Sequence, residues 1–438
     1  MGSVARRIIV APFLCAFVSY LPGLPGPPGH TALAAQVPFD QAARDLSNTD
    51  PAVRLRTVQA LAEAAYSESA VPLARLVTDP QDAVQLAAIA AELNIFIAER
   101  IVPKKRIGLV VEVRNQILAE PLFSAGPSKI GPRHVPMEVL TALRAAARDD
   151  NRRVGLEALY AFGTLADEPS GEQRRDVLRT SGPDVAALIG ASDPALRFAA
   201  VRVMGRLFAR RAGDAAVDST VGDALISALN DNDRAIKIAA MRALGAMRYD
   251  RAVESLTKLF EYYGKGDNAE AALDALAHIA HPASIPLFAA QLAGKTPALR
   301  ALAIDGLARE GDQAALDQIK AVADTDRDDA VSLAGAFAAA LLGNGSLDRL
   351  VHAAAKPRPQ ARQYLAELAP GRAQLFAQHA LDPDERVRLA VVDALGVSGD
   401  AEALKIVEPL LQDRDARVVR AAELAAARLR AAANKPSA

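Results

Sequence analysis

The sequence has almost no cysteine, no tryptophan and few aromatic residues. Cys15 is the single cysteine among 438 residues, and aromatic residues make up 4% of the chain. One thiol excludes both an intramolecular disulfide and a thiolate metal site. Strands favour aromatic and β-branched side chains, whereas alanine, which is abundant here, is the best helix former. This composition therefore favours thin, closely packed helices over a β-sheet core.

Charge of one sign is not in excess either. The 51 Lys and Arg residues nearly balance the 52 Asp and Glu residues, and the formal net charge is -1. A broad nucleic-acid-binding surface would need a basic excess. Hydrophobic residues form 51% of the chain, and this much apolar surface excludes general disorder. The sequence therefore predicts a folded protein and no nucleic-acid partner.

Residues 1–35 differ from the rest of the chain. Two arginines precede an apolar run over 8–21, and a stretch of small residues follows at 31–35. A basic start, a short apolar run and an Ala-x-Ala site are typical of a secretory signal peptide. The apolar run is shorter than the roughly 20 residues that a membrane-spanning helix needs. We therefore expect cleavage near Ala34 or Ala35, a periplasmic or secreted protein, and no membrane span in the mature chain.

Residues 36–430 repeat one pattern. Its clearest copies start at Asp50, Asp193, Asp233 and Asp382, and apolar residues follow at helical spacing. Aspartate can cap a helix, and the proline that follows three of these residues is tolerated in a first turn. A helix pair of about 30 residues buries too little surface alone, whereas stacked pairs share one core. We therefore predict an all-α fold, an α-solenoid of about ten to eleven helix pairs.

A glycine lies near the end of the first helix in several copies. The examples are Gly205, Gly245, Gly306 and Gly396. Glycine just past a helix end suits a left-handed C-terminal cap. We therefore expect these glycines to terminate their helices.

The repeated pattern resembles HEAT repeats. The run from Asp382, Asp-Pro-Asp-Glu-Arg-Val-Arg-Leu-Ala-Val-Val-Asp-Ala-Leu-Gly, carries the resemblance best. The short period is similar to that of phycobilisome-lyase-type HEAT-like repeats, and the resemblance covers roughly residues 40–430. In this family, similar positions form a ladder of Asp–Arg hydrogen bonds between successive repeats. The resemblance implies such a structural ladder at Asp50, Arg54, Asp193, Arg197, Asp233, Lys237, Arg300, Asp382 and Arg388. The alternative for these residues is a cationic stripe that binds an acidic partner.

Residues 97–136 depart from the pattern as an irregular insertion, which we expect to interrupt the stack. Its second part is rich in Pro and Gly, and residues 96–136 hold seven basic against three acidic side chains. Long irregular loops are usually functional or disordered. The candidates for partner binding are Lys104, Lys105, Arg106, Arg114 and Arg133, and a solvated insertion is the alternative. Residues 431–438 are expected to form a disordered C-terminal tail.

Motifs for catalysis are missing from the sequence. There is no Gly-x-Ser-x-Gly, no phosphate-binding glycine loop and no His-Glu-x-x-His. We therefore predict no catalytic, cofactor-binding or metal-ligating residue, and no cofactor. Solenoids present long concave surfaces that suit protein or peptide partners. The sequence thus indicates an exported protein-binding scaffold of this kind. A HEAT-like enzyme or cofactor-binding protein related to phycobilisome lyases is the alternative.

Overall fold

The computed structural model describes residues 39–97, 119–126, 131, 134–167, 171–211, 216–343 and 345–433. The predicted signal peptide and most of the basic insertion lie outside these residues. Helices make up the regular structure of the described part, which contains no β-strand. The prediction of an all-α solenoid is confirmed.

The helices form two layers that follow the chain. Layer A, defined by the first helix of each repeat, contains α2 (Pro51–Ala64), α4 (Asp82–Phe96), α7 (Arg152–Leu165), α9 (Pro194–Leu207), α11 (Arg234–Met247), α13 (Asp267–Ile279), α15 (Pro297–Arg309), α17 (Asp329–Leu341), α19 (Pro359–Leu368), α20 (Glu385–Gly396) and α22 (Ala416–Ala433). Neighbouring helices of layer A pack directly on one another, as α9 does on α11 and α11 on α13. This packing gives the stack a continuous core.

Layer B contains the second helices of the repeats. These are α3 (Ala70–Ala74), α6 (Met137–Ala146), α8 (Gly171–Leu188), α10 (Ser219–Ala228), α12 (Val253–Tyr263), α14 (Ile285–Leu292), α16 (Leu316–Thr325), α18 (Asp348–Ala354) and α21 (Glu402–Val407). Two helices stand apart from this scheme, α1 (Phe39–Asp45) before the first pair and α5 (Ala119–Ala125) within the predicted insertion. Short 3-10 helices connect the layers at Ser67–Ser69, Arg75–Thr78, Asp250–Ala252, Pro282–Ser284, Gln313–Ala315, Ala373–Phe376, His379–Leu381 and Glu408–Gln412.

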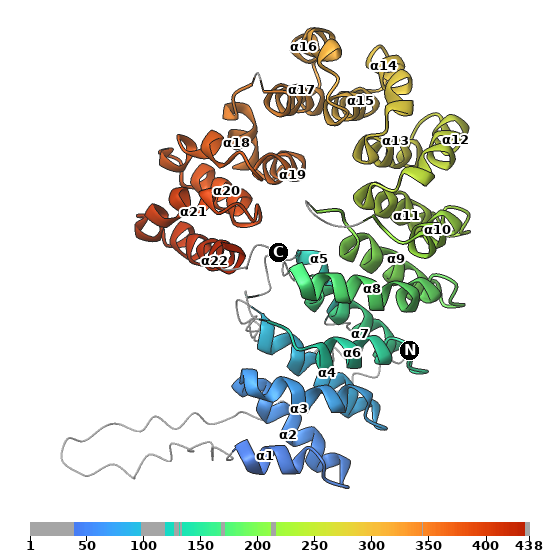
Figure 1. Ribbon diagram of the computed structural model, residues 1–438, viewed down its shortest axis with the longest axis vertical. Coiled ribbons are helices and arrows are strands. Elements are labelled where there is room, and N and C mark those ends of the chain that lie inside the picture. The colour runs from blue at the N-terminus through green and yellow to red at the C-terminus, as the bar shows by residue number, and fades with distance from the viewer. Residues whose placement is uncertain are drawn as a thin grey trace, which may run out of the picture.

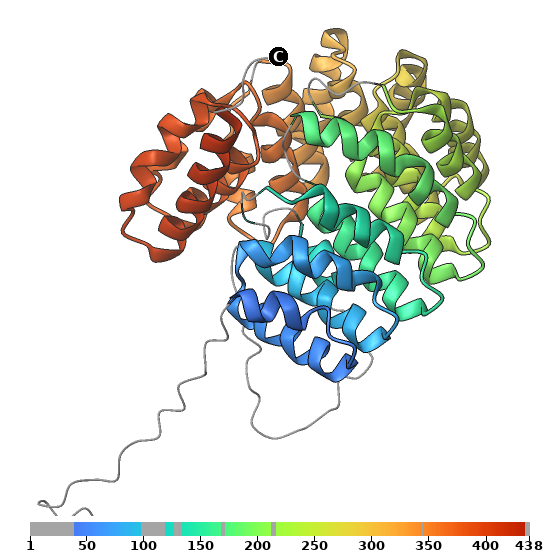
Figure 2. The same cartoon turned by 60° about the horizontal axis from the view of Figure 1, so that its bottom comes forward.

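The stack curves into an open arch. In Figure 1, α13, α15 and α17 lie on the inner side of the arch, and α12, α14 and α16 lie on its outer side. The turned view shows the successive helix pairs side by side along the chain (Figure 2). Layer A therefore forms the concave face in this part of the molecule.

Apolar residues at helical spacing build the core between the layers. Val387, Val391 and Leu395 of α20 are fully buried, as are Ile236 and Leu244 of α11. Capping aspartates start both helices: Asp233 accepts a hydrogen bond from the backbone of Ala235, and Asp384 accepts one from Arg386. Side-chain caps of this kind satisfy backbone N–H groups that have no partner within the helix.

The insertion does not interrupt the stack, contrary to the expectation from the sequence. Helix α4 packs directly on α7, although about 55 residues separate them in the chain. The side chain of Gln85 on α4 donates to Asp149, which lies just before α7, at 2.9 Å. The layer A helices before and after the predicted insertion are therefore direct neighbours.

The predicted role of the helix-end glycines is wrong. Gly205, Gly245 and Gly306 lie inside their helices, Gly396 is the last residue of α20, and none of the four has a positive φ. A Cβ at Gly245 would stand 2.8 Å from Cα of Ala275 on α13. Glycine is therefore present there because two layer A helices approach closely.

One finding concerns the membrane. Within the described ranges, we find no helix with the length and apolar character needed to cross a bilayer.

Candidate functional site

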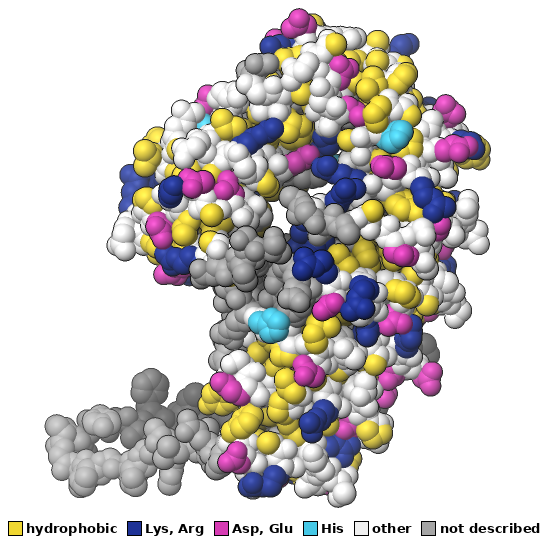
Figure 3. Space-filling model, viewed as in Figure 1, with side chains coloured by type: hydrophobic (Ala, Val, Ile, Leu, Met, Phe, Trp, Pro, Cys, Tyr) yellow, Lys and Arg dark blue, Asp and Glu magenta, His cyan; other side chains and the backbone are white. Residues whose placement is uncertain are grey.

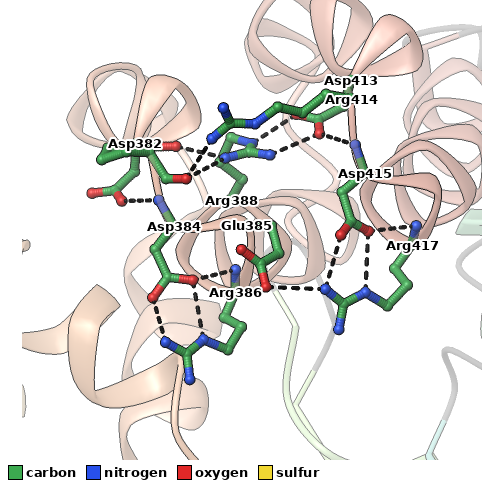
Figure 4. Close-up of polar contacts among 10 residues, drawn as sticks. Asp382, Asp384, Glu385, Arg386, Arg388, Asp413, Arg414, Asp415 and Arg417 are labelled. Atoms are coloured by element: carbon green, nitrogen blue, oxygen red, sulfur yellow. Dashed lines mark hydrogen bonds and ion pairs between the residues drawn. The ribbon is translucent and has the colours of Figure 1, made fainter.

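Buried arginines link successive repeats of layer A. Arg388 on α20 donates from Nε to Oδ2 of Asp413 at 2.7 Å and from Nη2 to Oδ1 at 2.8 Å, while its Nη1 donates to the carbonyl of Asp382 (Figure 4). The side chains of Arg388 and Asp413 are 5% and 6% exposed. The hydrogen bond from Arg388 lowers the pKa of Asp413. Two parallel bonds from one planar guanidinium fix the spacing between two repeats.

The same ion pair recurs in α2, α9 and α15. The Nε–Oδ2 distances are 2.7 to 2.8 Å in the pairs Arg54–Asp79, Arg197–Asp231 and Arg300–Asp326. Each of these arginines also donates from Nη1 to a backbone carbonyl just before its own helix. These three residues and Arg388 are the arginines that the family resemblance assigns to an inter-repeat ladder.

The carboxylates of the predicted acidic residues do not pair with the predicted basic residues, although Asp193 pairs with Arg152 of the preceding repeat. Asp50, Asp193 and Asp233 accept hydrogen bonds from Ala52, Ala195 and Ala235, so each caps the helix of its own repeat. Asp382 accepts the backbone N–H of Asp384, and its carbonyl binds Arg388. The carboxylate of Asp382 therefore does not bind the arginine of its own repeat.

The aspartates that bind the arginines lie two residues before the next helix cap. Asp231 binds Arg197 and also accepts the N–H of the capping residue Asp233 at 2.8 Å. An Asp-x-Asp spacing is therefore the sequence signal for this position at Asp231, Asp326 and Asp413, whereas Gln81 follows Asp79 at this spacing. Lys237 forms no ion pair within the described chain, since Gly264 and Gly266 occupy the corresponding places in the following repeat.

The predicted partner-binding residues are the basic side chains of the insertion. Lys104, Lys105, Arg106, Arg114 and Arg133 all lie outside the described residues. They stay candidates from the sequence alone.

A second set of residues, which sequence reasoning missed, lines the concave face. Each layer A helix contributes a pair of equivalent positions, four residues apart. From α7 to α15 these concave positions are Tyr160 and Thr164, Arg202 and Arg206, Arg242 and Ala246, Asp274 and His278, and Asp305 and Arg309. The repeat spacing relates them to one another. That spacing, applied to residues inside each helix, is the signal that could have identified them.

Helix α5 covers the first part of the concave face. Arg202 lies 5.2 Å from the ring centre of Phe123 and donates to Glu120 at 3.1 Å. Arg206 donates to the carbonyl of Phe123 at 2.6 Å and to Asp167 at 2.8 Å. These contacts hold α5 against α7 and α9, so part of the predicted insertion occupies the arch.

Helix α19 covers the last part of this stretch. The hydroxyl of Tyr364 donates to both carboxylate oxygens of Asp305, at 2.7 and 2.9 Å. Arg309 binds Glu367 through two bonds of 2.8 and 2.9 Å. Nε2 of Gln363 lies 3.2 Å from Nε2 of His278. These contacts join α19 to α13 and α15, which are not its neighbours in the stack, in addition to its packing on α17.

Burial and charge shift the pKa values of this cluster. Burial raises the pKa of Asp305 to about 6, although Arg309 and Tyr364 oppose the shift. Burial also acts to raise the pKa of Glu367, but the hydrogen bond and charge of Arg309 and the charge of Arg248 bring it below its usual value. Asp305 is therefore a largely protonated acid near pH 5, whereas Glu367 is ionised.

The described residues offer no metal site. None of them belongs to a group of three or more His, Cys, Asp and Glu side chains suited to hold an ion. The acids on the concave face bind arginine, tyrosine or histidine side chains instead. The described concave face therefore carries charged and hydrogen-bonding side chains.

Helix pairs stacked in two layers with ladder contacts define an α-solenoid. Residues 183–263, from the second half of α8 to the end of α12, match the family model for HEAT repeats. These residues are therefore similar to HEAT repeats. The phycobilisome-lyase-type subclass stays a prediction. A helical scaffold with HEAT repeats suggests a role in protein interaction.

Two solved structures are similar to this chain at low sequence identity. A crystal structure of an engineered protein has a TM-score of 0.43 at 18% identity, over 89% of this chain and 98% of the other. A second engineered protein has a TM-score of 0.35 at 17% identity, over 62% of this chain and 95% of the other. No curated protein matches the sequence.

Proposed function

We propose that the protein is an exported scaffold that binds a protein or peptide partner on its concave face. One observation carries the proposal. Between α5 and α19, which cover the face on either side, no helix of the described chain covers Arg242 and Ala246 of α11, which are exposed and half-buried, respectively. Solenoids use concave surfaces of this kind to bind extended partners.

Export is supported by the sequence of residues 1–35, with its basic start, short apolar run and small-residue site. We propose the periplasm or the extracellular space as the location. A chain without cysteine after cleavage is compatible with an oxidising compartment.

Crosslinking in living cells tests both parts. The full-length precursor is expressed with an affinity tag, crosslinked and purified, and mass spectrometry identifies the captured species and the mature N-terminus. We expect a defined envelope or secreted protein and an N-terminus at residue 35 or 36. An uncleaved Met1 would contradict export, and the absence of any specific capture would contradict the scaffold.

A further inference from the structure

Three arginines in and beside α11 have no counter-ion among the described residues. Arg242, Arg248 and Arg210 are exposed, and none forms an ion pair or a side-chain hydrogen bond in the part of the chain that the structure describes. We call these three residues the open arginine segment. Figure 3 shows Lys and Arg side chains gathered along the hollow of the arch.

The backbone holds this segment in place. Arg248 caps α11 in the left-handed conformation, with φ 51°, and its N–H binds the carbonyls of Gly245 and Leu244. The N–H of Arg210 binds the carbonyl of Ala246 at 2.8 Å. Arg210 and Arg248 therefore lie at the same end of α11, and Arg242 lies six residues before Arg248 on this helix.

The nearest described acids of the neighbouring layer A repeats are already bound. Asp274 lies 3.2 Å from Nδ1 of His278, and Glu367 binds Arg309. On the other side, Asp167 binds Arg206. The charges of Arg242 and Arg248 reach Asp274 and Glu367, respectively, but make no contact with them. The segment therefore presents positive charge that the described neighbours do not neutralise.

We propose that the open arginine segment binds a carboxylate-rich segment of the protein partner. The inference rests on the proposed function and names the chemistry of its partner. Guanidinium groups suit carboxylates because each can form two parallel charge-assisted bonds. A nucleic acid fits less well, since the chain has a formal net charge of -1 and polyphosphate binding relies on a broad basic field.

The direct test measures binding of a fluorescein-labelled hexaglutamate peptide by fluorescence anisotropy at low salt. The test variant is Arg210→Glu/Arg242→Glu/Arg248→Glu. The control variant is Arg56→Glu/Arg175→Glu/Arg327→Glu, which makes the same charge change at exposed arginines elsewhere. We expect the test variant to weaken binding by about tenfold or more and the control by less than about twofold.

Circular dichroism and the binding of an oligonucleotide complete the test. Circular dichroism checks that both variants fold, and Arg242→Glu alone replaces the test variant if it does not. Equal binding by the test and control variants would overturn the proposal. So would a single-stranded oligonucleotide that binds more tightly than the peptide and depends on the same three arginines.

The crosslinking experiment separates this proposal from the proposed function. If the test variant captures the same partner as the wild-type protein, the scaffold stands and the arginine site is wrong. If no partner is captured but hexaglutamate binding still depends on the three arginines, the site stands and the scaffold is wrong.

Discussion

At the scale of single residues, the buried arginines join neighbouring repeats. Arg388 uses all three of its guanidinium nitrogens, two on Asp413 and one on a carbonyl. The sequence indicates the arginine through the Val-Arg step of the repeat. It does not indicate the partner, because a carboxylate that caps a helix and one that binds an arginine are the same residue type. Only the fold distinguishes Asp231 from Asp233.

Removing one side of such a pair leaves a buried charge without a partner. We expect Arg388→Ala to lower the free energy of unfolding by about 3 kcal/mol. Arg388→Lys keeps the charge but cannot form both bonds, so we expect about half of that loss. Arg420→Ala, at an exposed position on α22, is the control and should change little. Urea unfolding measures all three, and an unchanged Arg388→Ala variant would contradict a structural role for the pair.

The Asp305 carboxyl should make stability depend on pH. Its pKa is about 6 in the fold against 3.8 as the ordinary value, so the folded state binds the proton more tightly. This stabilisation is fully present below pH 4 and is lost as the pH rises through about 6. We expect the difference in Tm between wild type and Asp305→Asn to change across this range. A difference that is constant from pH 4 to 7.5 would contradict the shift.

At the scale of helices, the sequence predicts most of the first helices but not how closely they pack. The Asp-Pro starts and the apolar spacing place α2 and α9 correctly, whereas α20 begins two residues later than its Asp-Pro pair predicts, with Asp384 as its cap. The sequence predicts helix caps at the glycines because glycine is common at caps. Close helix crossings also require glycine. Which role applies depends on the neighbouring helix, and a single repeat does not contain that information.

Gly245 tests the close approach of helices. Alanine favours helix by about 1 kcal/mol over glycine, but a Cβ at Gly245 would stand 2.8 Å from Cα of Ala275. We expect Gly245→Ala to be destabilising by about 1 to 3 kcal/mol. At Gly155 on α7 the nearest atom is 3.4 Å away, so Gly155→Ala should be neutral or slightly stabilising. Thermal unfolding compares them, and a stabilised Gly245→Ala variant would show that the helices are not in tight contact.

At the scale of the whole molecule, the sequence predicts a curved stack but not what lies within the curve. Helices α5 and α19 cover parts of the concave face through residues far away in the chain, such as Glu120 with Arg202 and Tyr364 with Asp305. No described helix covers the concave residues of α11 between α5 and α19, and these residues define the candidate site. Contacts between distant repeats have no periodic signal, so sequence reasoning chose the basic insertion instead.

The contacts of α19 should set the curvature. Tyr364→Phe with Glu367→Gln removes the bonds to Asp305 and weakens those to Arg309 while keeping the side-chain sizes. We expect a larger radius of gyration by small-angle X-ray scattering, unchanged helix content, and a loss of about 1 to 3 kcal/mol in stability. Glu385→Gln, which weakens the exposed 3.1 Å pair with Arg417, is the control and should leave the scattering unchanged. An unchanged radius in the double variant would show that α19 does not control the bend.

The central claim, that the concave face binds the partner, is tested most directly by site-specific photocrosslinking in cells. A photoreactive phenylalanine derivative replaces either Gln363, exposed on α19 beside His278, or Tyr262, 80% exposed on the outer helix α12. The account predicts a discrete crosslinked protein from position 363 and none from position 262. Capture from position 262 alone, or equally from both, would contradict it.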